Sequence, residues 1–272
     1  MSPIVMPALF AAFVWWFATG LILFLDRLPM RTFPWSFTAA TGVAAASLYG
    51  LAASRTEVTV AGAYCAFACA VGVWGWIEMS FLTGYITGPR RHGCPKGCSG
   101  WPHFWHGVAA LLYHELAIVL LSVAVIGLTW GGPNQVGAWA FIILWGMRES
   151  AKLNLFLGVA NLGESLLPPH LAYLASFFRR RRMNALLPVS VLAGAGLAIY
   201  EGLKAADPAT DAFGRAGATL LATLLALGAL EHLALVVPVR IELLWKLLDR
   251  RPTRGAESRV ATPIHAHVEE PV

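Results

Sequence analysis

The fold is decided by the stretch Val5-Met-Pro-Ala-Leu-Phe-Ala-Ala-Phe-Val-Trp-Trp-Phe-Ala-Thr-Gly-Leu-Ile-Leu-Phe-Leu25, which contains no charged residue. At 1.5 Å per residue, an α-helix needs about 20 such residues to cross about 30 Å of hydrocarbon. The stretch is not typical of a cleavable signal peptide, because no basic region precedes it and Asp26-Arg27 follow it directly. We therefore predict a transmembrane helix here.

Six further apolar runs follow along the chain, and we expect each of them to span the membrane as a helix. They are Trp35–Ala53, Val58–Ile86, Trp105–Thr129, Val136–Leu157, the shorter Leu186–Tyr200, and Phe213–Val237. The composition agrees, because only 13% of the 272 residues are charged, whereas soluble domains carry about 25%. The sequence thus predicts an all-α, polytopic transmembrane helix bundle of about seven spans.

The basic residues between these runs are distributed very unevenly. One set of connections holds fifteen of them: Arg27, Arg31, Arg90, Arg91, Lys96, Arg179, Arg180, Arg181, Arg182, Arg240, Lys246, Arg250, Arg251, Arg254 and Arg259. The other set holds three, Arg55, Lys204 and Arg215. Since Lys and Arg accumulate in cytoplasmic loops, we predict a periplasmic N-terminus and a cytoplasmic C-terminus. The net charge of +5 then reflects membrane topology, and we expect no binding to nucleic acid.

Two cytoplasmic segments have a composition of their own. The connection after the fifth run contains Pro168-Pro169, an apolar stripe over residues 171–178 and then Arg179–Arg182. This pattern is typical of a helix lying on anionic lipid, although an ordinary positive-inside anchor explains the arginines equally well. After Arg250 the chain mixes proline, charge and small residues without periodicity. We therefore expect a transmembrane domain over residues 1–249 and a disordered tail over residues 250–272.

Ionisable side chains occur inside four of the predicted spans, where each costs about 2.5–3.5 kcal/mol and needs a partner or a role. They are Glu78, His114, Glu115, Arg148, Glu149, Lys152, Glu231 and His232. With the predicted topology they fall in one layer, roughly 8–15 Å below the cytoplasmic surface. Lys152 can pair with Glu149 three residues away, and Asn154 and Asn161 are expected on the opposite face of that helix. We predict a single buried polar site.

The residue types leave four roles open for this layer. The charges could be structural ion pairs that tie the bundle together. Carboxylates and histidines on several helices suit a di-metal centre, although His114-Glu115 and Glu231-His232 are adjacent pairs and no Glu-x-x-His motif is present. A histidine at membrane depth also suits axial ligation of a chlorin or haem, with Arg or Lys holding carboxylates. An ion or proton pathway is the fourth role.

The four cysteines form two pairs with different expectations. Cys65 and Cys69 lie four residues apart in the third run and predict a small-residue face for close helix packing. The segment His92-x-Cys94-x3-Cys98-x4-His103 lies in a predicted cytoplasmic loop and has ligand types suited to zinc. Its spacing departs from the usual C-x2-C, so the pattern leaves metal binding by Cys94 and Cys98 open. A disulfide is not expected in a reducing compartment.

Several long motifs resemble one protein family. The most distinctive is Gly146-Met-Arg-Glu-Ser-Ala-Lys-Leu-Asn-Leu-Phe-Leu-Gly-Val-Ala-Asn161. Others are Glu78-Met-Ser-Phe-Leu-Thr-Gly-Tyr-Ile-Thr-Gly-Pro-Arg90, Tyr113-His-Glu-Leu-Ala-Ile118, Leu167-Pro-Pro-His-Leu-Ala-Tyr-Leu, Met183-Asn and Leu230-Glu-His232. In these stretches the chain resembles the photosynthetic complex assembly proteins of the PuhE type, encoded near the reaction-centre H-subunit gene of purple phototrophic bacteria. The similarity covers about residues 15–247.

The resemblance implies a multi-pass protein of the bacterial inner (intracytoplasmic) membrane that assists assembly of photosynthetic complexes or bacteriochlorophyll handling. The family motifs contain most of the polar layer, while Glu149 is less typical of them. We therefore predict that the cofactor-binding residues are Glu78, His114, Glu115, Arg148, Lys152, Asn154, Glu231 and His232. A chlorin, either bacteriochlorophyll or a precursor, is the expected cofactor, with His114 and His232 as axial ligands, and a di-iron centre is the less favoured one.

The leading hypothesis is thus a non-enzymatic assembly factor. Its expected partners are membrane lipids and photosynthetic reaction-centre or light-harvesting subunits. The alternative is a membrane-embedded metalloenzyme acting on a tetrapyrrole or an isoprenoid. A transporter is disfavoured, because no span is clearly broken by Gly and Pro at its middle.

Overall fold

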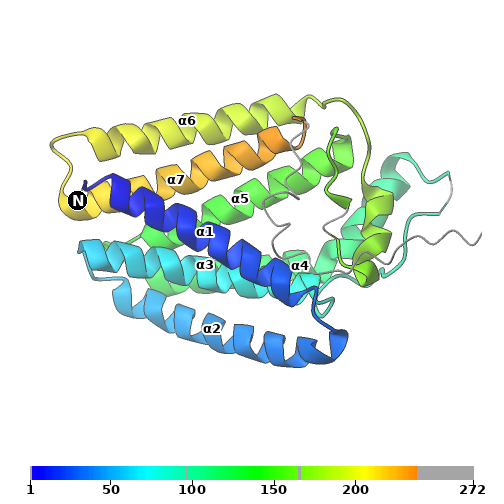
Figure 1. The fold of residues 1–272 in the computed structure, drawn as a ribbon, viewed down its shortest axis with the longest axis horizontal. Helices are drawn as coiled ribbons and strands as arrows, with labels where there is room; N and C mark the ends of the chain where they lie inside the picture. The colour runs from blue at the N-terminus through cyan, green and yellow to red at the C-terminus, as the bar shows by residue number, and fades with distance from the viewer. Residues whose placement is uncertain (1, 96, 165–166, 238–272) are drawn as a thin grey trace, which may run out of the picture.

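The computed structural model describes residues 2–95, 97–164 and 167–237, and seven long α-helices account for most of them (Figure 1). The helices are α1 (Val5–Leu25), α2 (Phe33–Ser54), α3 (Val60–Leu82), α4 (Gly100–Thr129), α5 (Val136–Leu157), α6 (Leu186–Ala206) and α7 (Ala212–Ala234). Two 3-10 segments, η1 (Met30–Thr32) and η3 (Pro169–Phe177), lie in the connections. The described part of the chain contains no strand, which confirms the all-α prediction.

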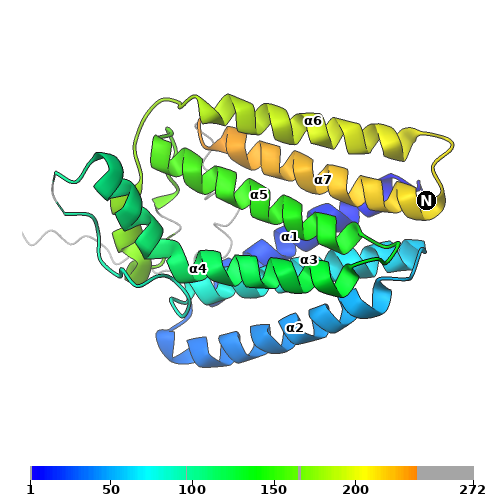
Figure 2. The same cartoon turned by 180° about the vertical axis from the view of Figure 1, so that it is seen from behind.

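Six of the helices are long and apolar enough to cross a membrane, and α5 is the exception. The exception has a chemical cause, since α5 carries Arg148, Glu149 and Lys152 within its last ten residues. It nevertheless extends alongside the other helices in both views (Figures 1 and 2). The protein is therefore a polytopic helical membrane protein, while α5 as a seventh span and the orientation of the termini stay predictions. The predicted tail over residues 250–272 lies outside the described residues.

Helices α3 and α7 lie at the centre of the bundle, with α1 on one face and α4 and α5 on the other (Figures 1 and 2). Their inward faces bury large apolar side chains such as Phe67, Ile77 and Leu220, against which Phe141 of α5 also packs. The outer helices α2 and α6 pack mainly against α3 and α7, respectively. This arrangement leaves the apolar outer surfaces of α1, α2 and α6 for lipid.

Small residues set the closest helix contacts. A side chain at Gly72 of α3 would lie 2.3 Å from the Ser47 hydroxyl of α2, and one at Gly50 of α2 would lie 2.5 Å from the sulfur of Cys69. The backbones of α2 and α3 can therefore approach closely, as small-residue interfaces in membranes do. Cys69 thus has the packing role predicted for it, while Cys65 is exposed.

At one end of the bundle, the loop between α3 and α4, the first turns of α4 and the segment η3 pack together, and we call this part the cap. The loop after α3 packs on α4, where the Arg90 amide donates to the Ala109 carbonyl and the His114 amide donates to the Thr87 carbonyl. Gly88 allows this approach, because a Cβ there would lie 2.1 Å from the Ala109 oxygen. Helix α4 bends at this point, and its first turns diverge from the bundle (Figure 2). An inserted backbone segment is a recognised cause of such bends.

The predicted interfacial helix packs onto the protein. The segment η3 is a 3-10 helix, in which residues three apart lie on one face. Leu171, Leu174 and Phe177 are accordingly buried against Phe81 and Ala110. The apolar stripe that suggested contact with lipid therefore completes a small core within the cap. Whether the arginines that follow it meet lipid headgroups stays a prediction.

Candidate functional site

Two sets of ion pairs join three helices below the cap. The Arg148 guanidinium of α5 donates to the Glu78 carboxylate of α3 at 3.0 Å. The Lys152 ammonium donates to Glu115 of α4 at 2.6 Å and to Glu149 of its own helix at 2.7 Å. Two cations, which their i,i+4 spacing places on one face of α5, thus neutralise carboxylates of α3, α4 and α5 itself.

These side chains are only partly buried. The Glu78 side chain is 13% exposed and Lys152 is 18% exposed, whereas Arg148 is 40% exposed. Desolvating a charge is costly, and the cost is met only when the partner and its hydrogen bonds are in place. The ion pairs therefore explain how charged residues can be accommodated inside a membrane bundle. They do not by themselves indicate a function.

A cavity of about 1040 Å³ opens beside the ion pairs. Its wall comes from α1, α3, α4, α5, α7 and η3 and is mostly apolar. The aromatic residues of the wall are Trp15, Trp16, Trp74, Phe81, Phe104, Phe156, Phe177 and Phe178. An apolar pocket with a few convergent polar groups is the usual form of a ligand site, and this volume lies at the upper end of the usual range of about 300–1,000 Å³.

The charges of the cavity wall do not balance. Five carboxylates line it, namely Glu78, Glu115, Glu149, Glu164 and Glu231, against three cations, Arg148, Lys152 and Arg180. Glu164 pairs with Arg180 at 3.7 Å. Glu231 has no ion pair within the described ranges, and its side chain is exposed to the cavity. The Glu231 carboxylate is therefore free to contact a ligand that enters the cavity.

A second polar cluster lies behind the cavity wall, between α5, α6 and α7. The Oγ atoms of Ser150 and Ser190 are 2.7 Å apart, and the Asn154 amide donates to the Ser190 hydroxyl at 3.1 Å. His232 contributes its Nε2, 3.0 Å from the Ser150 hydroxyl. Its Nδ1 lies 2.8 Å from the Gly228 carbonyl, which can only accept. Nδ1 therefore carries a hydrogen and donates it to this carbonyl, and both nitrogens are used within the bundle.

His114 occupies a third position. Its side chain is fully buried, its ring centroid is 4.5 Å from that of Phe81, and neither ring nitrogen has a hydrogen-bond partner among the described residues. Neither His114 nor His232 lines the cavity. Axial ligation of a ligand in this cavity by either histidine is therefore not what the geometry favours.

The predicted layer thus divides into parts. Glu78, Glu115, Arg148, Lys152 and Glu231 line one cavity together with Glu149. Asn154 and His232 belong to the neighbouring cluster, which the sequence reasoning missed because it left out Ser150 and Ser190. The signal was present, since Ser150 and Asn154 are four residues apart on α5.

Asn161 was placed incorrectly. Helix α5 ends at Leu157, and Gly158 adopts a left-handed φ of 117° that stops it. Asn161 therefore lies beyond the helix, where its side-chain amide donates to the carbonyls of Ala234 and Val237. It satisfies the end of α7 and does not extend a polar face of α5.

The fold and the site together define a class: a polytopic helical membrane protein with an ion-paired, aromatic-lined cavity among its helices. Within that class, the chain belongs to the family described as "Protein of unknown function (DUF3623)", which matches residues 1–255. It is 38% identical over 268 residues to the "Uncharacterized 30.4 kDa protein in puhA 5'region" of Rhodobacter capsulatus, and the alignment covers 96% of each chain. No solved structure matches it.

Proposed function

We propose that this protein is an integral-membrane factor of the photosynthetic apparatus, which assists assembly of photosynthetic complexes or the handling of bacteriochlorophyll. The observation that carries the proposal is the cavity of about 1040 Å³ with its aromatic wall and the Glu231 carboxylate, which has no ion pair among the described residues. The name of the Rhodobacter capsulatus relative refers to the region 5′ of puhA, which supports a photosynthetic role. The multi-pass helical fold fits action in the membrane where such complexes assemble.

The ligand that suits this cavity is a chlorin, which is a large, flat and mostly apolar molecule. Indole and phenyl rings such as Trp15, Trp74 and Phe104 offer faces and edges for stacking on such a macrocycle. An apolar wall also accommodates hydrocarbon substituents, and the cavity is at least as large as the pockets that bury drug-sized molecules. The residues present therefore fit a tetrapyrrole better than a small ion.

The charged residues have separate tasks in this proposal. Arg148 and Lys152 are neutralised by the protein's own glutamates, so they position the wall and are less available to ligand carboxylates than the sequence suggested. Glu231 is available. Glu231 lines the cavity, whereas His114 and His232 do not, and a carboxylate oxygen is a suitable ligand of Mg²⁺, so Glu231 is the better placed candidate for contact with a magnesium chlorin.

The alternative, a metalloenzyme of the di-metal carboxylate kind, has less support. Such a centre needs several carboxylates directed at the metals, whereas Glu78, Glu115 and Glu149 are directed at Arg148 and Lys152. Among the described residues, the group of three or more metal-ligating side chains lies in the cap and not in this layer. We therefore develop the pigment-handling proposal.

The test is to purify the full chain in mild detergent from cells grown phototrophically and to record its absorption spectrum. We expect red-region chlorin bands that co-purify with the protein. The substitution Ala151→Phe adds a ring to the cavity wall and should remove most of the bands. Ala193→Phe is the matched control, because Ala193 is exposed on the outer face of α6. A colourless wild-type protein, or equal pigment in Ala151→Phe, would overturn the proposal.

A further inference from the structure

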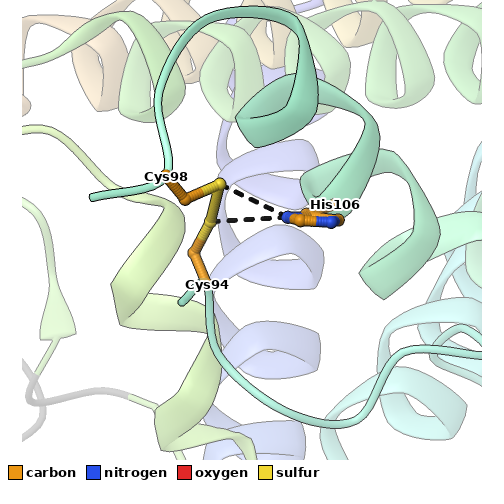
Figure 3. Close-up of side chains that lie close together, drawn as sticks. All are labelled: Cys94, Cys98 and His106. Atoms are coloured by element: carbon orange, nitrogen blue, oxygen red, sulfur yellow. Dashed lines mark hydrogen bonds between the residues drawn. A yellow bond between two sulfur atoms is a disulfide. The ribbon is translucent and has the colours of Figure 1, made fainter. Parts of the chain in front are cut away.

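A second group of reactive side chains lies in the cap, apart from the cavity charges. The structure joins Cys94 and Cys98 by a disulfide, which was not expected from the sequence, and His106 Nδ1 lies 3.3 Å from Cys98 Sγ and 3.6 Å from Cys94 Sγ (Figure 3). These three ligand atoms all lie within 4.8 Å of one another. Both cysteines point toward the imidazole of His106 in Figure 3. The sequence motif had suggested a different set, with His92 in the place of His106.

A fourth donor lies beside this group. His103 Nδ1 is 3.3 Å from Cys94 Sγ, and the His103 side chain is buried. Its ring stacks on Phe156 with centroids 5.2 Å apart and also contacts Phe177. His103 and His106 are three residues apart in the first turns of α4, so they share a face of that helix. The sulfur pair thus faces two imidazoles on one helix.

The three nitrogen–sulfur distances match those between ligand atoms around zinc. With Zn–S near 2.3 Å and Zn–N near 2.05 Å, the edge of a tetrahedron that joins a sulfur to a nitrogen measures roughly 3.5 Å. The three nitrogen–sulfur distances here are 3.3, 3.3 and 3.6 Å. The two cysteine Cα atoms lie 6.2 Å apart. Two thiolates and two imidazoles are a common ligand set of structural zinc sites.

Hydrogen bonds of the surrounding chain position the residues that would ligate the metal. The Cys94 amide donates to the Ser176 hydroxyl of η3 at 2.9 Å, and the Cys98 amide donates to the Pro95 carbonyl at 3.1 Å. Arg90 donates to the Gly93 carbonyl at 2.8 Å. Gly97 adopts a positive φ of 80°, which lets the chain turn back toward Cys98. The loop is therefore shaped by its own hydrogen bonds to bring both sulfurs to α4.

We propose that, when the disulfide is reduced, Cys94, Cys98 and His106 bind one zinc ion that fastens the loop of the cap to α4 and η3, with His103 beside Cys94 as the fourth ligand. The disulfide between Cys94 and Cys98 is the rival state of the two sulfurs. It does not need two imidazoles beside the sulfurs, and the arginine distribution predicts that this loop is cytoplasmic, where thiols remain reduced. The inference does not depend on what the cavity holds.

The location gives the zinc site a structural consequence. His103 packs on Phe156 and Phe177, and both of these rings line the cavity. A metal bound by the loop would therefore fix the His103 ring, which supports the cavity wall at Phe156 and Phe177. Structural zinc sites contribute free energy of folding directly, so removal of the ion should loosen the cap before the bundle.

The test is the zinc content of the full chain, purified in detergent under reducing conditions without a metal-affinity tag. We expect one zinc per chain in the wild type. Cys98→Ser and His106→Ala should each reduce the content at least tenfold. His92→Ala and Cys65→Ser are the matched controls, because His92 is exposed beside the site and Cys65 is a distant thiol; both should retain one zinc.

Two further measurements keep the inference open to refutation if a variant fails to fold. Wild-type protein stripped with a chelator should bind Co²⁺ with the visible absorption of a tetrahedral thiolate site, and zinc should displace it. When cells are quenched with acid, which releases zinc and preserves the redox state, Cys94 and Cys98 should be among the thiols that are then alkylated without a reductant. Metal-free wild type, octahedral Co²⁺ spectra, a Cys94–Cys98 disulfide in the cell, or full zinc content in His106→Ala would each overturn the proposal.

Discussion

Helix α5 carries two kinds of polar residue on two of its faces, and the structure completes them differently. Arg148 and Lys152 face the cavity and pair with carboxylates that remain partly exposed. Ser150 and Asn154 face α6 and α7, where they join Ser190 and His232 in a buried hydrogen-bonded cluster. A hydrogen-bonded cluster between helices fixes their positions, whereas a charged wall beside an open volume has capacity left for a ligand. The predictions below test this difference.

The largest effect is expected at Lys152, which holds two glutamates at once. Lys152→Met leaves Glu115 and Glu149 beside each other without a cation. Breaking a fully buried pair costs about 3–5 kcal/mol, and we expect about 2–4 kcal/mol here because both carboxylates are partly exposed. Thermal unfolding in detergent measures the change.

Two controls separate lost charge from lost packing at Lys152. Lys204→Met removes a similar pair with Glu201 on the surface, where such pairs contribute about 0–1 kcal/mol. Adding Glu115→Gln and Glu149→Gln to Lys152→Met should restore most of the stability, since neutral replacements of an ion pair are often tolerated. If the triple variant is no more stable than Lys152→Met, unpaired charge is not the cause.

A substitution in the hydrogen-bonded cluster should lower the stability of the protein without changing the amount of bound pigment. His232→Ala removes both hydrogen bonds of a fully buried ring and leaves a cavity, so we expect a loss of about 2–3 kcal/mol. The pigment bands of the folded fraction should stay unchanged, because His232 does not line the cavity. Loss of pigment from a folded His232→Ala protein would return this histidine to the list of candidate ligands.

The two regions also differ in how far the sequence predicted them. Helix bounds followed from apolar runs, and Val5–Leu25 and Val136–Leu157 were predicted as the structure has them. The gathering of Glu78, Glu115, Arg148 and Lys152 followed from depth along each helix. Rotation about the helix axis did not follow, because apolar residues surround each span and give little sign of which face is inside. That is why His114 and His232 were placed with the cavity charges.

The cap shows the opposite limit. Its ligands lie close together in the chain, so Cys94 and Cys98 were recognisable by residue type alone. The sequence could not decide between His92 and His106 as the ligand, because that choice depends on where the loop turns back onto α4. The packing of η3 depended likewise on a 3-10 period, which places Leu171, Leu174 and Phe177 on one face.

Asp26, directly after α1, is a carboxylate that, in the described part of the chain, neither pairs with a cavity cation nor lines the cavity. Asp26 is buried with one oxygen unpartnered among the described residues, and burial raises its pKa from 3.8 to about 7 although Arg27 acts in the opposite direction. The folded state then holds its proton over the range in which the unfolded state releases it. Stability due to this group is complete below pH 4, declines as the pH rises to about 7, and is constant above that.

The variant Asp26→Asn removes this titration. It should match the wild type at pH 4 and be more stable at pH 8 by about 1–2 kcal/mol, since an unpartnered buried carboxylate is no longer ionised. Melting temperatures measured across this range give the comparison. An equal difference at both pH values would show that Asp26 is ionised in the folded protein throughout.

The smallest effect on stability, and the most informative, is expected at Glu231. Glu231→Gln keeps the size of the side chain, and the wild-type carboxylate already faces the cavity without an ion pair in the described structure. The free energy of unfolding should therefore change by less than about 0.5 kcal/mol, whereas the co-purifying chlorin should fall severalfold. Glu78→Gln is the contrasting variant, because it strands Arg148 and should destabilise the fold. A Glu231→Gln protein that keeps its pigment, or one that unfolds as readily as Glu78→Gln, would show that the open carboxylate belongs to the scaffold and that the two faces of α5 differ in geometry alone.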